Sequence, residues 1–166
     1  MSEYQYVEHE FAPVYNEESQ VLVLGSLPSV KSREQGFFYG HPQNRFWRGL
    51  AAVYGNQEPQ TVEEKKAFLL QSGVAVWDVI ASCSIEGSSD SSIRDVVPND
   101  LSRILSAADI QAIFCNGKTS WNYYKKYQEA VTGIPAVSLP STSPANAAWT
   151  LEKLEGAWGV ISDYLE

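Results

Sequence analysis

Four short apolar segments, each followed by a polar loop, constrain most strongly how this chain can fold. They are residues 21–24, 73–80, 112–115 and 134–139. Uninterrupted apolar residues are typical of strands that are covered on both faces, as in a parallel sheet. The stretches between them have the apolar spacing of helices, and strands that alternate with helices form right-handed βαβ units. We therefore predict one α/β domain over residues 1–166, a three-layer αβα sandwich with a central four-stranded parallel sheet.

The rest of the chain is predicted to form helices and loops. Thr61 and Glu64 match a capping box, which places the start of one helix. Residues 82–92 are rich in serine and glycine and are interpreted as a loop. Residues 1–20 are polar and mixed, and their Phe11, Pro13 and Tyr15 are expected to lie across the domain surface. The predicted helices span residues 45–54, 61–71, about 99–107, about 119–133 and about 147–164.

The composition argues against several kinds of protein. No apolar run approaches the ~20 residues that cross a bilayer, and the acidic start MSEYQYVEHE lacks the regions of a secretory signal. Two cysteines, Cys83 and Cys115, are too few for an iron–sulfur cluster or a four-thiolate metal site. We therefore expect a cytoplasmic monomer with reduced thiols, no metal, no cofactor and no membrane contact.

The net charge of −8 argues against non-specific coating of DNA, because phosphate neutralisation supplies most of that affinity. A local basic patch is still compatible with this charge. Two groups of basic residues are either solvated surface or part of such a patch: Lys31, Arg33, Arg45 and Arg48, and Lys118, Lys125 and Lys126.

Polar residues follow the predicted strands at their carboxyl ends, where open α/β sheets bind ligands. Gly25 lets the main chain approach a ligand, and Ser26 and Ser29 add hydroxyls beside it. Asp78 near the end of the second strand is either a site residue or a carboxylate that caps a turn. Asn116 begins a strand-to-helix turn of the kind that binds anions. Together these loops predict a site for a polar, planar or phosphorylated ligand.

Loops at opposite ends of the chain resemble those of a known family. GSLPS (25–29) followed by GHPQNRFW (40–47) is similar to the first motif of the uracil-DNA glycosylase superfamily, and its HPxNRFW portion resembles the mismatch-specific branch. LPSTS (139–143) is similar to the second motif, a loop that enters the DNA minor groove. FCNGK (114–118) resembles the strand-to-helix turn of thymine-DNA glycosylases. The resemblance covers about residues 20–165.

Two departures from the family pattern narrow the resemblance. Leu27 stands where many families have a catalytic Asp or Asn, and Leu139 stands where several have His or Asn. With Asn44 retained, this combination resembles the hypoxanthine-DNA glycosylase branch (family 6), in which an asparagine downstream of the first motif carries catalysis. The resemblance implies hydrolysis of the N-glycosidic bond of a deaminated base in duplex DNA. Hypoxanthine is favoured over uracil or xanthine, and no lysine nucleophile motif is present, so a monofunctional repair enzyme is expected.

The resemblance also assigns roles to residues. Asn44 is the expected catalytic residue, whose amide oxygen would orient the attacking water; the alternative is that Asn44 caps the helix that follows it. Tyr39 would stack on the flipped base, and Asp78 would accept a hydrogen bond from hypoxanthine N1–H. His41 is interpreted as a residue that holds its turn rather than as a general acid. The expected base-binding residues are Gly25, Ser26, Leu27, Tyr39, Asp78 and Asn116.

Contacts to the DNA backbone are expected from hydroxyl, amide and lysine side chains around the same loops. The second loop would also fill the gap left by the flipped nucleotide. The expected DNA-binding residues are Ser29, Lys118, Ser141, Thr142, Ser143 and Asn146.

Two other functions fit parts of the sequence. A small-molecule nucleoside or nucleotide hydrolase would suit the acidic net charge and would turn over free inosine. A non-catalytic module that binds damaged DNA would suit the replacement of two expected polar positions by Leu27 and Leu139.

Overall fold

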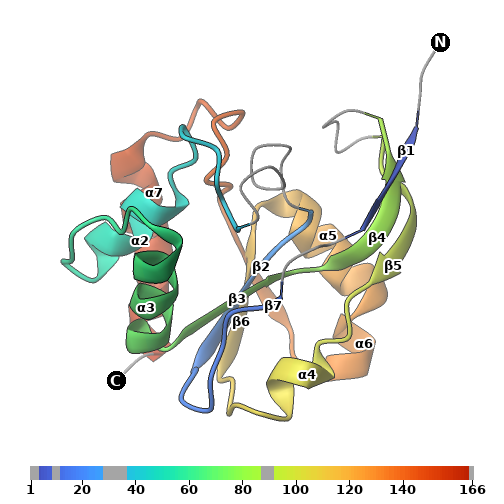
Figure 1. Ribbon diagram of the computed structural model, residues 1–166, viewed down its shortest axis with the longest axis horizontal. Coiled ribbons are helices and arrows are strands. Elements are labelled where there is room, and N and C mark those ends of the chain that lie inside the picture. The colour runs from blue at the N-terminus through green and yellow to red at the C-terminus, as the bar shows by residue number, and fades with distance from the viewer. Residues whose placement is uncertain (1–3, 9–11, 28–36, 87–91, 165–166) are drawn as a thin grey trace.

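A four-stranded parallel sheet runs through the centre of the computed structural model (Figure 1). The structure describes residues 4–8, 12–27, 37–86 and 92–164. In sheet order, the strands are β3 (Val74–Asp78), β2 (Val21–Gly25), β6 (Ala112–Asn116) and β7 (Ala136–Leu139). All three pairs of neighbouring strands are parallel, so the predicted central sheet is confirmed.

Helices cover both faces of this sheet, which explains why the residues of its strands are mostly apolar. Every residue of β2 and β3 is buried. Burying one large aliphatic side chain contributes about 1.5–3 kcal/mol, so a two-sided sheet concentrates stabilisation in a few strands. Figure 1 shows α2 (Phe46–Val53), α3 (Val62–Ser72) and α7 (Leu151–Trp158) on one side, and α4 (Ser102–Leu105), α5 (Lys118–Tyr127) and α6 (Glu129–Thr132) on the other.

A second, antiparallel sheet was not predicted. Its order is β1 (Gln5–Glu8), β4 (Ile80–Ile85) and β5 (Arg94–Pro98), and Figure 1 shows it beside the parallel sheet. The prediction of one strand over 73–80 was wrong at its end, because the chain bends at Val79 and continues as β4. The predicted loop 82–92 was wrong over 82–85, which belong to β4; residues 87–91 lie outside the described part. The serines at positions 82 and 84 favour a loop in the sequence pattern, and the partner strand β1 lies far away in the sequence. Local residues therefore do not indicate that β4 is a strand.

Several helix boundaries differ from the predicted ones for local reasons. The Thr61 cap is confirmed, because Thr61 Oγ1 accepts a hydrogen bond from Glu64 N at 3.0 Å. The helix predicted over about 119–133 is divided at Gln128 into α5 and α6. The last helix begins at Leu151 rather than 147, after a cap by Thr150, and continues as a 3₁₀ helix, η2 (Gly159–Tyr164).

An aromatic cluster supports the loop that precedes α2. Phe37, Phe38, Phe46 and Trp47 are all buried and belong to the core. The Phe46 ring stacks on Tyr39 with centroids 4.1 Å apart and packs edge-on against Trp47 at 4.8 Å. Aromatic pairs of this kind contribute about 0.5–1.5 kcal/mol beyond their buried area. The cluster therefore anchors Tyr39 between the core and the carboxyl edge of the sheet.

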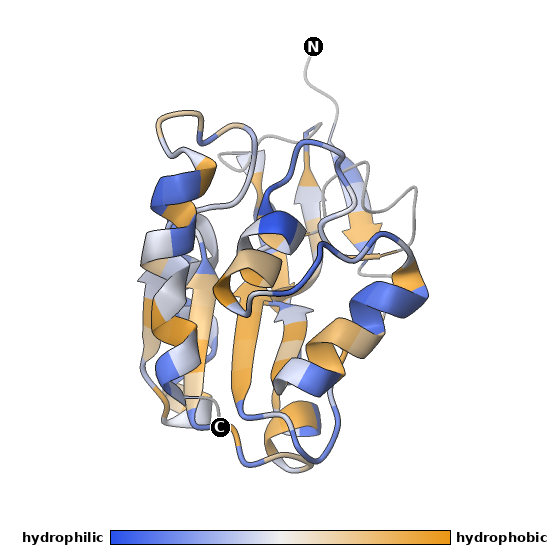
Figure 2. Cartoon of the chain, turned by 90° about the vertical axis from the view of Figure 1, so that its left-hand side faces the viewer, coloured by the Kyte–Doolittle hydropathy of each residue, from blue (hydrophilic) through white to orange (hydrophobic). Residues whose placement is uncertain are grey.

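Hydropathy follows the layers of the fold. In Figure 2 the strands are mostly apolar, and the helices show polar residues on their outer sides. Within the described ranges, no helix combines the length and apolar character needed to span a membrane.

Candidate active site

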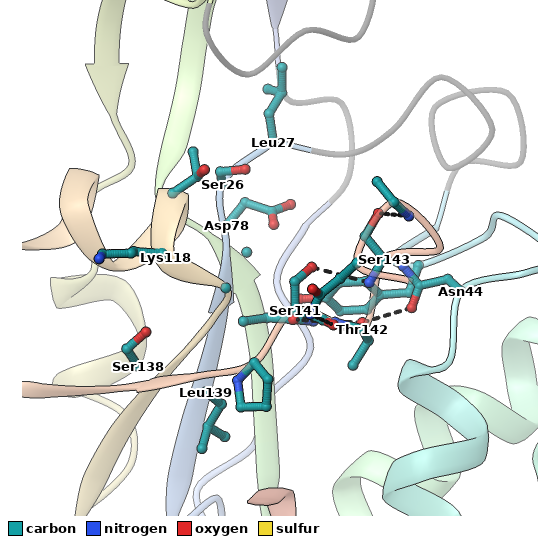
Figure 3. A pocket seen from close by; sticks show the side chains of 18 of the residues that line it. Ser26, Leu27, Asn44, Asp78, Lys118, Ser138, Leu139, Ser141, Thr142 and Ser143 are labelled. Carbon is teal, nitrogen blue, oxygen red and sulfur yellow. Dashed lines mark hydrogen bonds between the residues drawn. The ribbon is translucent and has the colours of Figure 1, made fainter. Parts of the chain in front are cut away.

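A cavity of about 840 Å³ opens at the carboxyl edge of the parallel sheet (Figure 3). All four strands lead into it, as the loop positions predict: the ends of β2 and β3, the turn after β6 and the long loop after β7 contribute lining residues. The loop before α2 closes one side with Phe38, Tyr39 and Asn44. Its size lies within the ~300–1,000 Å³ that is typical of small-molecule sites.

Twelve of the thirteen predicted site residues line this cavity, and the other, Ser29, lies outside the described residues. Figure 3 shows Lys118 across the cavity from Asn44, with Ser26 and Asp78 between them. The lining residues from the sequence analysis are Gly25, Ser26, Leu27, Tyr39, Asn44, Asp78, Asn116, Lys118, Ser141, Thr142, Ser143 and Asn146.

Gly25, Asp78 and Tyr39 meet at the cavity wall. Gly25 and Asp78 are partners in the register of β2 and β3. A Cβ atom on Gly25 would overlap Asp78 Oδ1 and would lie 3.1 Å from the Tyr39 hydroxyl. Glycine is required at position 25 because a side chain there would clash with both polar groups. The backbone conformation at Gly25 does not itself require glycine.

Tyr39 has a conformation that is unusual for a residue with a side chain. Its φ angle is 53°, in the left-handed region that side chains rarely adopt. One ring face is covered by Phe46, so a base could stack only on the other face. Burial raises the pKa of the Tyr39 hydroxyl well above its usual range, and the nearby Asp78 carboxylate raises it further. The hydroxyl therefore stays protonated, and its oxygen is buried.

The amide oxygen of Asn44 accepts two hydrogen bonds from other groups of the protein. Asn44 Oδ1 accepts hydrogen bonds from Phe46 N at 2.9 Å and from Thr142 Oγ1 at 2.8 Å. The first bond satisfies the N–H of the first residue of α2, but the helix begins at Phe46 with Arg45 as its N-cap, so Asn44 lies one residue before the expected capping position. The expectation that the amide oxygen holds the water disagrees with this geometry, because both of its lone pairs are occupied. The group that Asn44 can offer to the cavity is its Nδ2 amide NH₂, a hydrogen-bond donor.

Thr142 joins three loops from a buried position. Asn116 Nδ2 donates to Thr142 Oγ1 at 2.9 Å, and Thr142 N donates to Asn116 Oδ1 at 3.0 Å. The Thr142 carbonyl accepts from Arg45 N at 3.1 Å. Thr142 is only 2% exposed, and all its polar groups are bonded within the protein. The expected contact between Thr142 and a DNA phosphate disagrees with this geometry, because the hydroxyl and the N–H group of Thr142 already donate hydrogen bonds within the protein.

Arg45 is the residue whose role the sequence did not reveal. Its guanidinium donates to the carbonyl oxygens of Ser143 at 2.9 Å, of Asn146 at 3.1 Å and of Trp149. It therefore holds the second loop against α2 instead of facing DNA as part of a basic patch. No local pattern marks this role, because the bonded carbonyls lie about one hundred residues away in sequence.

The second loop and the turn after β6 fit closely together. Gly117 has a φ angle of 95°, and a Cβ there would lie 3.1 Å from the Ser141 side chain. Ser141 Oγ accepts from Ser143 N at 3.1 Å, and Asn146 Nδ2 donates to the Ser141 carbonyl at 3.0 Å. Lys118 is exposed at the start of α5 and lines the cavity. A lysine beside a helix N-terminus forms a suitable place for an anionic group.

His41 lies outside the residues that line the cavity and holds its own turn. His41 Nδ1 accepts from Gln43 N at 3.1 Å, and the His41 carbonyl accepts from Asn44 N at 2.9 Å. This agrees with the interpretation of His41 as a turn residue. Among the residues that the structure describes, no group of three or more His, Cys, Asp or Glu side chains could hold a metal ion.

Comparison with known proteins agrees with this geometry. The model of the uracil DNA glycosylase superfamily matches residues 12–162. A protein of Methanosarcina acetivorans named hypoxanthine DNA glycosylase is 32% identical over 157 residues, covering 93% of this chain and 98% of the relative. A protein of the same name from Methanosarcina barkeri is 34% identical over 151 residues, covering 89% and 93%.

A solved structure gives the same result for the fold. The solution NMR structure of a protein from Methanosarcina acetivorans, named as a candidate uracil DNA glycosylase, superposes with a TM-score of 0.77 at 30% sequence identity. The match covers 92% of this chain and 96% of that one. The chain therefore belongs to the uracil DNA glycosylase superfamily.

Proposed function

We propose that this protein is a monofunctional DNA glycosylase that hydrolyses the N-glycosidic bond of a deaminated base in duplex DNA, with hypoxanthine as the favoured base. The family and the hypoxanthine glycosylase name of two relatives support this proposal. The structural observation that carries it is the Asn44 amide, held at the wall of an open cavity by Phe46 and Thr142.

The target nucleotide must leave the base stack to reach this cavity. Flipping costs a few kcal/mol, and it costs least for a mismatched or damaged base, so part of the selectivity arises at this step. Tyr39 and Leu27 supply apolar walls for the base. The Asp78 carboxylate can accept a hydrogen bond from N1–H of hypoxanthine, which adenine lacks.

Bond cleavage places positive charge on the sugar and negative charge on the departing base. The C1′–N9 bond breaks and the base takes its electron pair. Water adds to C1′ and releases a proton to the solvent. Main-chain N–H groups beside Gly25 can donate hydrogen bonds to the leaving base.

Asn44 acts on the water by position and not as a base. Its Nδ2 group donates a hydrogen bond to the water oxygen, and the other lone pair of that oxygen is then directed at C1′. An oxocarbenium-like centre needs a well-placed nucleophile more than a strong one, so a neutral amide suffices.

The phosphates that flank the flipped nucleotide are proposed to contact Ser141, Ser143, Asn146 and Lys118, which surround the cavity. Ser29 stays a prediction, since it is outside the described residues. Action as a monomer and a cytoplasmic location also stay predictions.

The decisive experiment uses labelled duplexes that carry inosine, uracil, xanthine or a mismatched thymine, followed by alkaline cleavage at abasic sites. Wild-type protein should give strand breaks, most rapidly with inosine, and Asn44→Ala should abolish them. Asn122→Ala, an exposed asparagine on α5, serves as the matched control and should retain full activity. Turnover of free inosine without action on duplexes would favour the nucleoside hydrolase, and binding without base release would favour the non-catalytic module.

A further inference from the structure

We infer that Thr142 is a positioning residue, which orients the Asn44 amide through its hydroxyl group; this inference rests on the proposed function. Thr142 is buried at the joint between the loop before α2, the end of β6 and the loop after β7. Its hydroxyl lies 2.8 Å from Asn44 Oδ1 and 2.9 Å from Asn116 Nδ2.

Two backbone donors fix the direction of the whole hydrogen-bond chain. Phe46 N–H can only donate, so the atom of Asn44 that faces it is the amide oxygen. Thr142 N–H can likewise only donate, so it faces Asn116 Oδ1, and Asn116 Nδ2 is directed at the Thr142 hydroxyl. Because that hydroxyl accepts from Asn116, its own proton points to Asn44 Oδ1.

The chain therefore runs in one direction, from Asn116 through Thr142 to Asn44. Asn44 Oδ1 receives two donors that come from different elements, which fixes the plane of its amide group as well as its orientation. The Nδ2 group then points away from both donors. Removing the Thr142 hydroxyl would leave Phe46 as the remaining donor to Asn44 Oδ1, and the amide could rotate about its side-chain bond.

This arrangement links the second loop to the catalytic amide. Thr142 stays in place because its carbonyl accepts from Arg45 N and its N–H donates to Asn116. Thr142 and its two flanking serines, Ser141 and Ser143, all line the cavity, but Thr142 is buried and its polar groups are all bonded within the protein. Thr142 thus acts through Asn44 and touches no substrate atom.

The test compares Thr142→Val with Thr142→Ser. Valine has the shape of threonine but no hydroxyl, and serine keeps the hydroxyl. We expect Thr142→Val to lower the rate of base release at saturating inosine-containing DNA by about 10- to 100-fold, the scale of a small misplacement of a reacting group. Its dissociation constant for the duplex should stay at the wild-type value, and Thr142→Ser should restore the rate. Thr132→Val, which removes a hydroxyl bonded to Tyr124 where neither residue lines the cavity, is the matched control.

Asn116→Asp gives a second test if Thr142→Val does not fold. A carboxylate at this position accepts from the Thr142 hydroxyl and turns its proton away from Asn44, so the rate at saturating DNA should fall again. A wild-type rate in either folded variant would overturn the inference, as would a loss of DNA affinity that accounts for the whole effect of Thr142→Val. A wild-type protein that releases no base would instead refute the proposed function.

Discussion

Replacing Gly25 by alanine should disturb the site through one methyl group. The added Cβ would overlap Asp78 Oδ1 and would lie 3.1 Å from the Tyr39 hydroxyl. Neither neighbour moves easily, because Asp78 is buried at the end of β3 and the Tyr39 ring is stacked on Phe46. Overpacking of this kind costs about 1–3 kcal/mol. For a chain of this length that corresponds to a fall in Tm of roughly 2–12 °C.

The effect on activity should exceed the effect on stability. Displacement of the Asp78 carboxylate and of the Tyr39 side chain moves two residues proposed to contact the base, and a 1 Å misplacement can cost about 100-fold in rate. Thermal unfolding and single-turnover release of hypoxanthine from an inosine-containing duplex would measure the two effects.

Two other glycines provide matched controls. A Cβ on Gly49 or Gly156 would meet no atom within 4 Å, and both residues lie inside helices. Alanine there should raise stability by up to about 1 kcal/mol, because it is the better helix former, and should leave activity unchanged. If Gly25→Ala retained wild-type stability and rate, the proposed crowding of Gly25, Asp78 and Tyr39 would be refuted.

Three further predictions follow from the structure. Arg45→Met removes the hydrogen bonds to the carbonyls of the second loop, so it should destabilise the protein by about 1.5–3 kcal/mol and speed amide hydrogen exchange over residues 143–149; unchanged exchange there would contradict the role of Arg45. Burial raises the pKa of the Cys115 thiol to about 12, so the unfolded chain loses this proton first and stability should fall as pH rises above about 9. Unfolding of Cys115→Ala followed from pH 8 to 11 should show a shallower fall, and an identical slope would be evidence against this cause. Asp78→Asn should keep the fold but lose the preference for inosine over adenosine in competition assays, and an unchanged preference would remove Asp78 from base recognition.

Local sequence patterns were sufficient for the elements that are stabilised locally or buried on both sides. The apolar runs of β2 and β6 and the Thr61 cap were visible because a doubly covered strand or a helix start constrains its own residues. The antiparallel sheet was not predicted, because its strands are neither stabilised locally nor apolar throughout. Its strands contain serines, and their pairing joins Val7 to Cys83 across the chain, so no short window contains the signal.

For the candidate site, the sequence predicted where the residues gather but not which contacts they make. Its residues could be placed together from the sequence, since the carboxyl ends of parallel strands meet at one edge and the motifs mark those ends. Their individual contacts could not. Whether Asn44 presents oxygen or nitrogen depends on Thr142, 98 residues away, and Arg45 holds carbonyls that lie equally far along the chain.

By itself, then, the sequence determined the layered α/β fold, the family resemblance and the edge of the sheet at which the site forms. The tertiary structure alone decided which groups are left to act there: the Asn44 amide NH₂, the buried Thr142 hydroxyl and the Arg45 guanidinium that holds the second loop. The physical reason is that burial patterns repeat along a chain and can be read locally. A hydrogen-bond partner is chosen only when distant segments meet.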